Sequence, residues 1–179
     1  MDIMAILSPD DRDQLEVDVI IEVSASHGPV KYEFDKQAGL LRVDRFLHTS
    51  MVYPCNYGFI PDTLSGDEDP VDVLLYSTYP VVPGALVRCR PIGVFITEDE
   101  KGKDAKILCI PTTKVDPFLK EIKTYKDLPE LFLKQVAHFF EHYKDLEKDK
   151  WVKTVGWEGE LEARDIIRQA IRSYGDFTV

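Results

Sequence analysis

The pattern of apolar and polar positions changes partway along the chain. Up to residue 111, short apolar runs are separated by turns rich in glycine and proline, and residues 17–23 and 30–35 alternate between apolar and polar side chains. Alternation with period two is typical of strands that bury one face, and it places Glu22 opposite its neighbouring valines. Further strands are expected over 39–47, 71–76, 85–96 and 105–111.

The last third of the chain has helical periodicity instead. Apolar residues recur every three or four positions through 127–148, including Leu131 and Leu146. Asp127 and Glu130 resemble a capping box, with Pro129 in the first turn. A second helix is expected over 160–175, ending at Gly175. Its inward-facing residues are expected to be Leu161, Ile166, Ile167, Ala170 and Ile171. The predicted class is α+β and β-rich, a small barrel-like sheet with helices packed outside.

Composition narrows the classes of function. The chain has 179 residues, of which 44% are hydrophobic, and this predicts one domain over 1–179. The net charge of −10 argues against a nucleic-acid partner or an anionic-membrane partner. The three cysteines are an odd number without zinc-site spacing, and residues 1–13 lack the features of a signal peptide. These features predict a soluble, unprocessed protein in the cytoplasm.

Four carboxylates, Asp67, Glu68, Asp69 and Asp72, fall within six positions. A solvated turn would explain the first three. Asp72 lies inside an apolar run, where an unpartnered carboxylate is costly to bury. The cluster therefore predicts a bound cation, and ligands that are all oxygen atoms favour Mg²⁺ or Mn²⁺. A second acidic loop, 97–106, carries Asp99 and Asp104 at its flanks, and Lys106 lies just inside the next expected strand.

Two motifs with similar carboxylate spacing fit less well. An EF-hand loop that began at Asp67 would have Val71 and Asp72 where a ligand and a glycine are required. The haloacid dehalogenase pattern places its first aspartate after a buried strand, whereas here the apolar strand follows the motif.

The segment DEDPVDV, 67–73, resembles the signature D-[SGDN]-D-[PE]-hydrophobic-D-hydrophobic of the soluble family I inorganic pyrophosphatases, and only Glu68 departs from it. We expect Glu68 to face solvent. The likeness extends over most of the chain and is strongest to the bacterial branch of the family. Its blocks are 20–35, 43–64, 88–107 and 128–159. The resemblance implies an OB-fold-like five-stranded closed barrel with additional strands and two helices in the C-terminal half.

The resemblance also implies a reaction, the Mg²⁺-dependent hydrolysis of inorganic pyrophosphate to two orthophosphates by a metal-activated water or hydroxide. Asp69 would be the general base. Several Mg²⁺ ions would bind in each active site, and Mn²⁺ or other divalent cations could substitute. The residues implied as metal ligands are Asp67, Asp72 and Asp104, then Asp99 beside Asp104, Glu22 through metal-bound water, and Glu33 near the substrate-side metal.

The implied substrate contacts are cations and hydroxyl groups. The phosphate-binding cations would be Lys31, Arg45, Lys106 and Lys144, and the hydroxyl donors would be Tyr57 and Tyr143. Tyr53 also matches an active-site position of the family, although packing explains it equally well. The family's hexamers place equivalents of His138 and His142 at a subunit contact, so the resemblance implies a homohexamer, and a pH-sensitive assembly is a hypothesis.

Two rival interpretations rest on other features. The segment HFFEH matches the H-x-x-E-H zinc-peptidase signature, in which His138 and His142 would bind zinc and Glu141 would activate water. So short a pattern arises easily by chance, and no third ligand follows. A non-enzymatic OB-type binding module would have similar strands, but the net charge and the aspartate clusters oppose it.

Overall fold

The structure is a computed structural model that describes residues 15–177. Within these residues, eight strands and two α-helices follow one another, with two short 3₁₀ helices before the first α-helix. The elements are β1 (Val17–Val23), β2 (Val30–Asp35), β3 (Leu40–Phe46), β4 (Asn56–Ile60), β5 (Val71–Leu75), β6 (Leu86–Asp99), β7 (Gly102–Pro111), the 3₁₀ helices Pro117–Leu119 and Tyr125–Asp127, α1 (Glu130–His142), β8 (Val152–Glu158) and α2 (Glu160–Phe177).

Five strands form a closed barrel. Their order is β1-β4-β5-β7-β6, and β1 also pairs with β6, which closes the ring. The β5–β7 pairing is parallel and the others are antiparallel. β8 extends the sheet beyond β6, and β2 and β3 form a separate two-stranded sheet. The OB-fold-like five-stranded barrel with additional strands is therefore confirmed.

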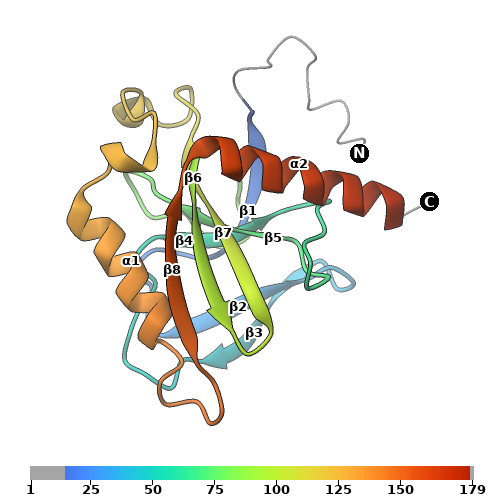
Figure 1. Cartoon of the computed structure of the whole chain (residues 1–179), viewed down its shortest axis with the longest axis vertical. Helices are drawn as coiled ribbons and strands as arrows, with labels where there is room; N and C mark the ends of the chain where they lie inside the picture. The colour runs from blue at the N-terminus through green and yellow to red at the C-terminus, as the bar shows by residue number, and fades with distance from the viewer. Residues whose placement is uncertain (1–14, 178–179) are drawn as a thin grey trace.

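The apolar side chains form two cores, because β5 and β7 bury both faces. The interior core joins the barrel strands to α2, and its members include Val19, Val71, Val73, Ile107, Ala163 and Ile167. The outer core joins the opposite face of the same strands to α1, and its members include Leu74, Phe95, Leu108, Phe139 and Phe140. Figure 1 shows α1 along one side of the barrel and α2 across it.

Two strands were not predicted from the sequence. The segment 97–106, which was expected to be a loop, lies mostly on strands. All five residues of β4 are buried, so this strand has no alternation to reveal it. β8 lies between the helices, where no strand was expected. β6 extends to Asp99 and β7 begins at Gly102. Asp99 and Asp104 therefore lie on strands of a tight hairpin, which holds them more rigidly than a loop would.

The helix boundaries also differ from those predicted. Asp127 closes a capping box with Thr124 on the preceding 3₁₀ helix, and Pro129 is the N-cap of α1. α1 ends at His142, so Leu146 lies beyond it and is exposed, as is Leu131.

In α2 the buried residues are Ala163, Ile167 and Ala170, and the small alanines bring the helix close to the barrel. Leu161 is 70% exposed, so its predicted inward orientation is wrong. Ile166 and Ile171 are partly buried against the interior core. The helix continues through Gly175 to Phe177, so Gly175 does not end it.

Candidate active site

Polar side chains gather on the outer face of the barrel, beside α1. Val71 and Val73 belong to the interior core, so Asp72 between them points outward. The parallel pairing of β5 with β7 aligns Asp72 with Lys106. Asp104 is two residues before Lys106 and therefore lies on the same face. The strand register thus brings together residues from two distant acidic segments.

Close packing of β1 against β4 brings Glu22 and Tyr57 to the same region. Gly58 is opposite Ile21, and a Cβ atom at position 58 would lie only 1.9 Å from the carbonyl oxygen of Ile20. Only glycine allows this approach. Gly58 therefore sets the spacing of the two strands that present Glu22 and Tyr57.

Lys106 is at the centre of the polar cluster and is 4% exposed. Its Nζ lies 2.9 Å from Asp72 Oδ2 and 2.8 Å from Asp104 Oδ2, and it donates a hydrogen bond to the Tyr57 hydroxyl at 3.3 Å. Burial lowers the pKa of Lys106, but the two carboxylates outweigh burial and hold the pKa well above its usual value. Lys106 therefore stays charged at neutral pH and neutralises part of the charge of both aspartates.

Two adjoining cavities form a cleft around this cluster, and both are lined by Lys31, Tyr57, Asp67 and Asp72. We call the first, of about 280 Å³, the mixed-charge cavity. The predicted site residues that line only this cavity are Arg45, Tyr53, Asp99, Asp104, Lys106, Tyr143 and Lys144. We call the second, of about 600 Å³, the acidic cavity, and it adds Glu22, Glu33 and Asp69. The structure thus brings every residue predicted for catalysis, metal binding or substrate binding to one cleft.

In the mixed-charge cavity, cations and carboxylates form pairs. Lys144 Nζ lies 3.4 Å from Asp99 Oδ2. Arg45 Nε lies 3.0 Å from Glu147 Oε1, and Arg45 Nη1 contacts Asp44 Oδ2 at 2.5 Å. The predicted phosphate-binding cations are therefore held in place by acidic neighbours.

The acidic cavity has more carboxylates than cations to neutralise them. Lys31 pairs with Glu33 at 2.5 Å. Glu22 accepts a hydrogen bond from the backbone N–H of Phe34 at 2.7 Å, yet burial, with the charge of Asp72, raises its pKa to about 7. Burial also raises the pKa of Asp69, and the charges of Asp67 and Asp72 add to this effect. Burial is the main cause of both pKa shifts, and the neighbouring carboxylates add to it.

The turn before β5 orients the acidic motif through its own hydrogen bonds. Asp67 Oδ1 accepts bonds from Ser65 Oγ at 2.7 Å and from the backbone N–H of Asp69 at 3.2 Å. Glu68 is exposed, as predicted, and has a φ of +68°. This left-handed conformation suits Gly, Asn and Asp better than Glu, which gives a physical reason for the residues that the family pattern has there.

The three tyrosines differ in their packing. Tyr53 is 2% exposed, with its ring centroid 4.7 Å from that of Phe139 and 5.3 Å from that of Tyr57. Burial raises the pKa of Tyr143 to about 12 and that of Tyr57 well above its usual value. Both groups keep their protons at neutral pH and can donate hydrogen bonds toward the cleft.

Several cleft residues were missed from the sequence. Glu147 supports Arg45, and Lys150 Nζ lies 2.6 Å from Glu100 Oε1. Glu147 was expected within a helix, and α1 ends before it. Only the contacts of the segment after α1 with β3 and with the β6–β7 turn reveal these roles, so no local signal could have identified them.

His138 and His142 are on α1, and neither lines the cleft. Their ring centroids are 4.6 Å apart, and His142 Nδ1 lies 2.8 Å from Asp145 Oδ2. His138 lines a separate groove with Met51, Val52 and Leu131. Across residues 15–177, no three His, Cys, Asp or Glu side chains lie close enough to hold one metal ion.

Among the described residues, no helix is both long enough and apolar enough to cross a membrane.

Comparison with known proteins identifies relatives over nearly the whole chain. A sequence model of the family described as inorganic pyrophosphatase matches residues 19–175. An inorganic pyrophosphatase of Rickettsia typhi is 56% identical over 156 residues, which cover 87% of this chain and 88% of that protein. That of Caulobacter vibrioides is 52% identical over 161 residues, covering 90% and 91%. A crystal structure of an inorganic phosphatase from Anaplasma phagocytophilum matches with a TM-score of 0.88 and 52% identity, covering 95% of this chain and 99% of that one.

A closed barrel with carboxylates and cations in one cleft is typical of a hydrolase that acts on a small anion. The family match, the sequence identities and the structural likeness agree with that class. The chain belongs to the inorganic pyrophosphatase family. It is therefore an enzyme, an inorganic diphosphatase, and the zinc-peptidase and non-enzymatic interpretations are not supported.

Proposed function

We propose that the chain hydrolyses inorganic pyrophosphate to two orthophosphates in a reaction that depends on Mg²⁺ or a similar divalent ion. The observation that carries this proposal is the excess of carboxylates in the acidic cavity beside the cations of the mixed-charge cavity. Pyrophosphate is a polyanion, so it repels both a carboxylate cleft and an attacking hydroxide unless cations intervene.

The donor set fits hard divalent ions. The carboxylates of Asp67, Asp72, Asp99 and Asp104 offer only oxygen atoms, as Mg²⁺ and Mn²⁺ prefer. Burial, with the charge of neighbouring carboxylates, raises the pKa values of Glu22 and Asp69, and a bound cation would favour their charged forms. Mg²⁺ binds through one or two carboxylates and keeps several waters, so the cleft need not hold three carboxylates at one point. Glu22 and Glu33 would complete the acidic lining.

Metal ions in this cleft would neutralise the phosphate oxygens and make a water molecule more acidic. Asp69 would accept the proton of the attacking water, since a carboxylate with a raised pKa is a stronger base.

Cations and hydroxyl groups would hold the substrate in line for attack. Lys31, Arg45 and Lys144 would contact phosphate oxygens, with Arg45 able to bind two oxygens at once. Lys106 would supply charge to the phosphate beside Asp72 and Asp104. Tyr57 and Tyr143 would donate hydrogen bonds, and Tyr53 would mainly hold Tyr57 by packing.

We also propose a cytoplasmic homohexamer with His138 and His142 at a subunit contact. Support comes from the groove beside His138, which Met51, Val52 and Leu131 line with apolar side chains. The three cysteines are free and buried, which suits a reducing compartment. Sedimentation of the wild type and a His138→Ala, His142→Ala double variant at pH 8 and pH 5.5 tests this. A wild type that is not hexameric at pH 8 would contradict the assembly, and identical oligomers in every case would contradict a role for the two histidines.

The activity itself is tested by phosphate release from pyrophosphate with and without Mg²⁺. We expect release only with the metal, and a loss of at least about 100-fold in Asp69→Asn. Asp104→Ala should also lose activity, because it removes a metal ligand. Glu68→Gln is the matched control in the same acidic motif and should keep wild-type activity. Release without metal, or undiminished release by both active-site variants, would refute the proposal.

A further inference from the structure

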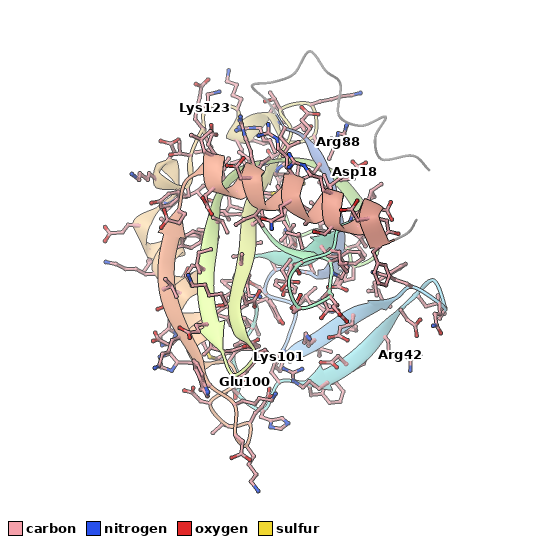
Figure 2. The ribbon with its side chains drawn as sticks, turned by 45° about the vertical axis from the view of Figure 1, so that its right-hand side comes forward. Asp18, Arg42, Arg88, Glu100, Lys101 and Lys123 are labelled. Atoms are coloured by element: carbon pink, nitrogen blue, oxygen red, sulfur yellow. The ribbon has the colours of Figure 1, made fainter. Side chains whose placement is uncertain are left out.

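A third cavity, of about 800 Å³, lies away from the cleft and shares no lining residue with it. Its walls come from the start of β6, the segment 112–115 after β7, Lys123 and the first turns of α2. Figure 2 shows Arg88 and Lys123 beside α2, whereas Glu100 and Lys101 of the cleft lie toward the opposite end of the molecule. The volume is typical of a small-molecule site.

The charge of this cavity is opposite to that of the whole chain. Five cationic side chains line it against two carboxylates, although the chain has a net charge of −10. The cations are Arg88, Arg90, Lys114, Lys123 and Arg164, and the carboxylates are Glu16 and Glu160. So much positive charge in one concave place favours an anionic ligand.

Carboxylates and backbone oxygens balance this charge only in part. Arg88 lies 3.4 Å from Glu16 and 3.2 Å from Asp18, and Arg164 lies 3.5 Å from Glu160, so three carboxylates face the five cations. Arg90 Nη2 donates hydrogen bonds to the carbonyl oxygens of Leu119 at 3.1 Å and Ile122 at 2.6 Å. Glu160 and Glu16 act on Arg90 electrostatically, but no carboxylate of residues 15–177 forms an ion pair with it. The cavity therefore keeps an excess of positive charge, with Arg90 oriented by backbone oxygens.

The remaining lining indicates what kind of anion would fit. Thr112 and Thr113 supply hydroxyl groups, and Leu15, Pro91 and Val115 supply apolar surface. Glu160 is the first residue of α2, so the positive end of a long helix also borders the cavity. The volume far exceeds what one orthophosphate fills. Polar donors on one wall and apolar side chains on another suit a phosphate attached to an organic group.

We propose that this cavity binds a small phosphorylated organic molecule, with its phosphate oxygens at Arg88, Arg90 and Lys123 and its apolar part against Pro91 and Val115. Guanidinium groups bind two phosphate oxygens at once, and two such groups here are spaced two residues apart on one strand face. The site is independent of the catalytic cleft.

Calorimetric titration of the full chain with ADP in EDTA tests the proposal, because EDTA removes the divalent ions that the cleft needs to hold a phosphate. We expect a Kd of about 0.1 mM that weakens as salt is raised. A Lys114→Gln, Lys123→Gln double variant should bind about tenfold more weakly. Lys120→Gln is the matched control, since Lys120 is exposed on the same segment but does not line the cavity.

Further titrations distinguish ADP binding in this cavity from binding in the cleft and from binding of the phosphate or the nucleoside alone. Adenosine should not bind, and orthophosphate should bind more weakly than ADP. Asp104→Ala, altered only in the cleft, should keep the wild-type Kd for ADP. The proposal is overturned if ADP does not bind or if the double variant has the wild-type Kd. Equal Kd values for ADP and orthophosphate, or loss of ADP binding in Asp104→Ala, would also overturn it. Should the double variant unfold, Arg88→Gln provides the same comparison.

Discussion

The two halves of the catalytic cleft balance their charges differently. In the mixed-charge cavity, Lys106 lies within 2.9 Å of both Asp72 and Asp104. In the acidic cavity, Glu22 is buried and accepts a hydrogen bond from the backbone N–H of Phe34, and burial raises its pKa to about 7. One half is internally neutralised, and the other has more carboxylates than cations. This division suits the proposed binding of both metal ions and a polyanion.

The largest expected effect comes from removing the cation of the neutralised half. Lys106→Met keeps most of the side-chain volume but leaves Asp72 and Asp104 facing one another without their shared cation. Breaking a buried charge pair from one side costs roughly 3–5 kcal/mol. We therefore expect the free energy of unfolding in urea to fall by about that amount in EDTA.

Lys101→Met is the control for that experiment, because Lys101 lines the same cavity but is exposed. It should change the free energy of unfolding by less than about 1 kcal/mol. If the two variants lost the same stability, Lys106 would not be neutralising the pair.

In the acidic cavity, removing a charge is expected to raise the free energy of unfolding, whereas removing the charge of Lys106 lowers it. The folded-state pKa of Glu22 is about 7 and its ordinary value is 4.5. The unfolded chain therefore releases this proton first, and wild-type stability falls as pH rises from 4.5 to about 7 and stays low above that. Glu22→Gln keeps the acceptor for Phe34 without the charge. In EDTA at pH 8 it should be more stable than the wild type by about 3 kcal/mol.

The stability gain of Glu22→Gln should disappear near pH 4, where Glu22 is protonated in both the folded and the unfolded chain. Glu33→Gln provides the comparison, since the Glu33 side chain is 53% exposed and pairs with Lys31, and it should show no such gain. A Glu22→Gln variant no more stable than the wild type at pH 8, measured by urea unfolding across pH, would contradict the cost assigned to the buried Glu22 charge.

The smallest effect concerns a residue of the acidic motif that lines neither cavity. Glu68 has a φ of +68°, which a residue with a long side chain adopts at a cost. Glu68→Asn should raise the free energy of unfolding by roughly 0.5–1 kcal/mol and leave activity unchanged. Glu121→Asn, at an exposed glutamate without positive φ, is the control. Equal stability changes in both would show that backbone conformation is not the cause.

The sequence was most informative where a charged residue lies within an apolar run. Asp72 inside an apolar run indicated a partner, and the structure supplies Lys106. The partner's identity depends on the parallel β5–β7 pairing, which joins strands from separate parts of the chain and has no local signature. For the same reason the link from Glu147 to Arg45 could not be predicted.

Strand prediction succeeded for β1 and β2, where apolar and polar residues alternate. It failed for β4, which is buried throughout. It also failed for β8, whose residues are partly exposed and form a strand by pairing with β6. The assignment of the fold as a closed barrel came from resemblance, since closure through the β1–β6 pairing is a property of the whole chain.

The central proposal is that the carboxylates of the cleft bind the metal ions and that its cations bind the substrate. Mn²⁺ binding, followed by electron paramagnetic resonance of the free ion, tests it in the wild type, Asp67→Asn and Arg45→Gln. Arg45 pairs with Glu147 and Asp44, neither of which is a proposed metal ligand. The account predicts at least about tenfold weaker Mn²⁺ binding in Asp67→Asn and wild-type binding in Arg45→Gln. Equal Mn²⁺ affinities in all three proteins would contradict it.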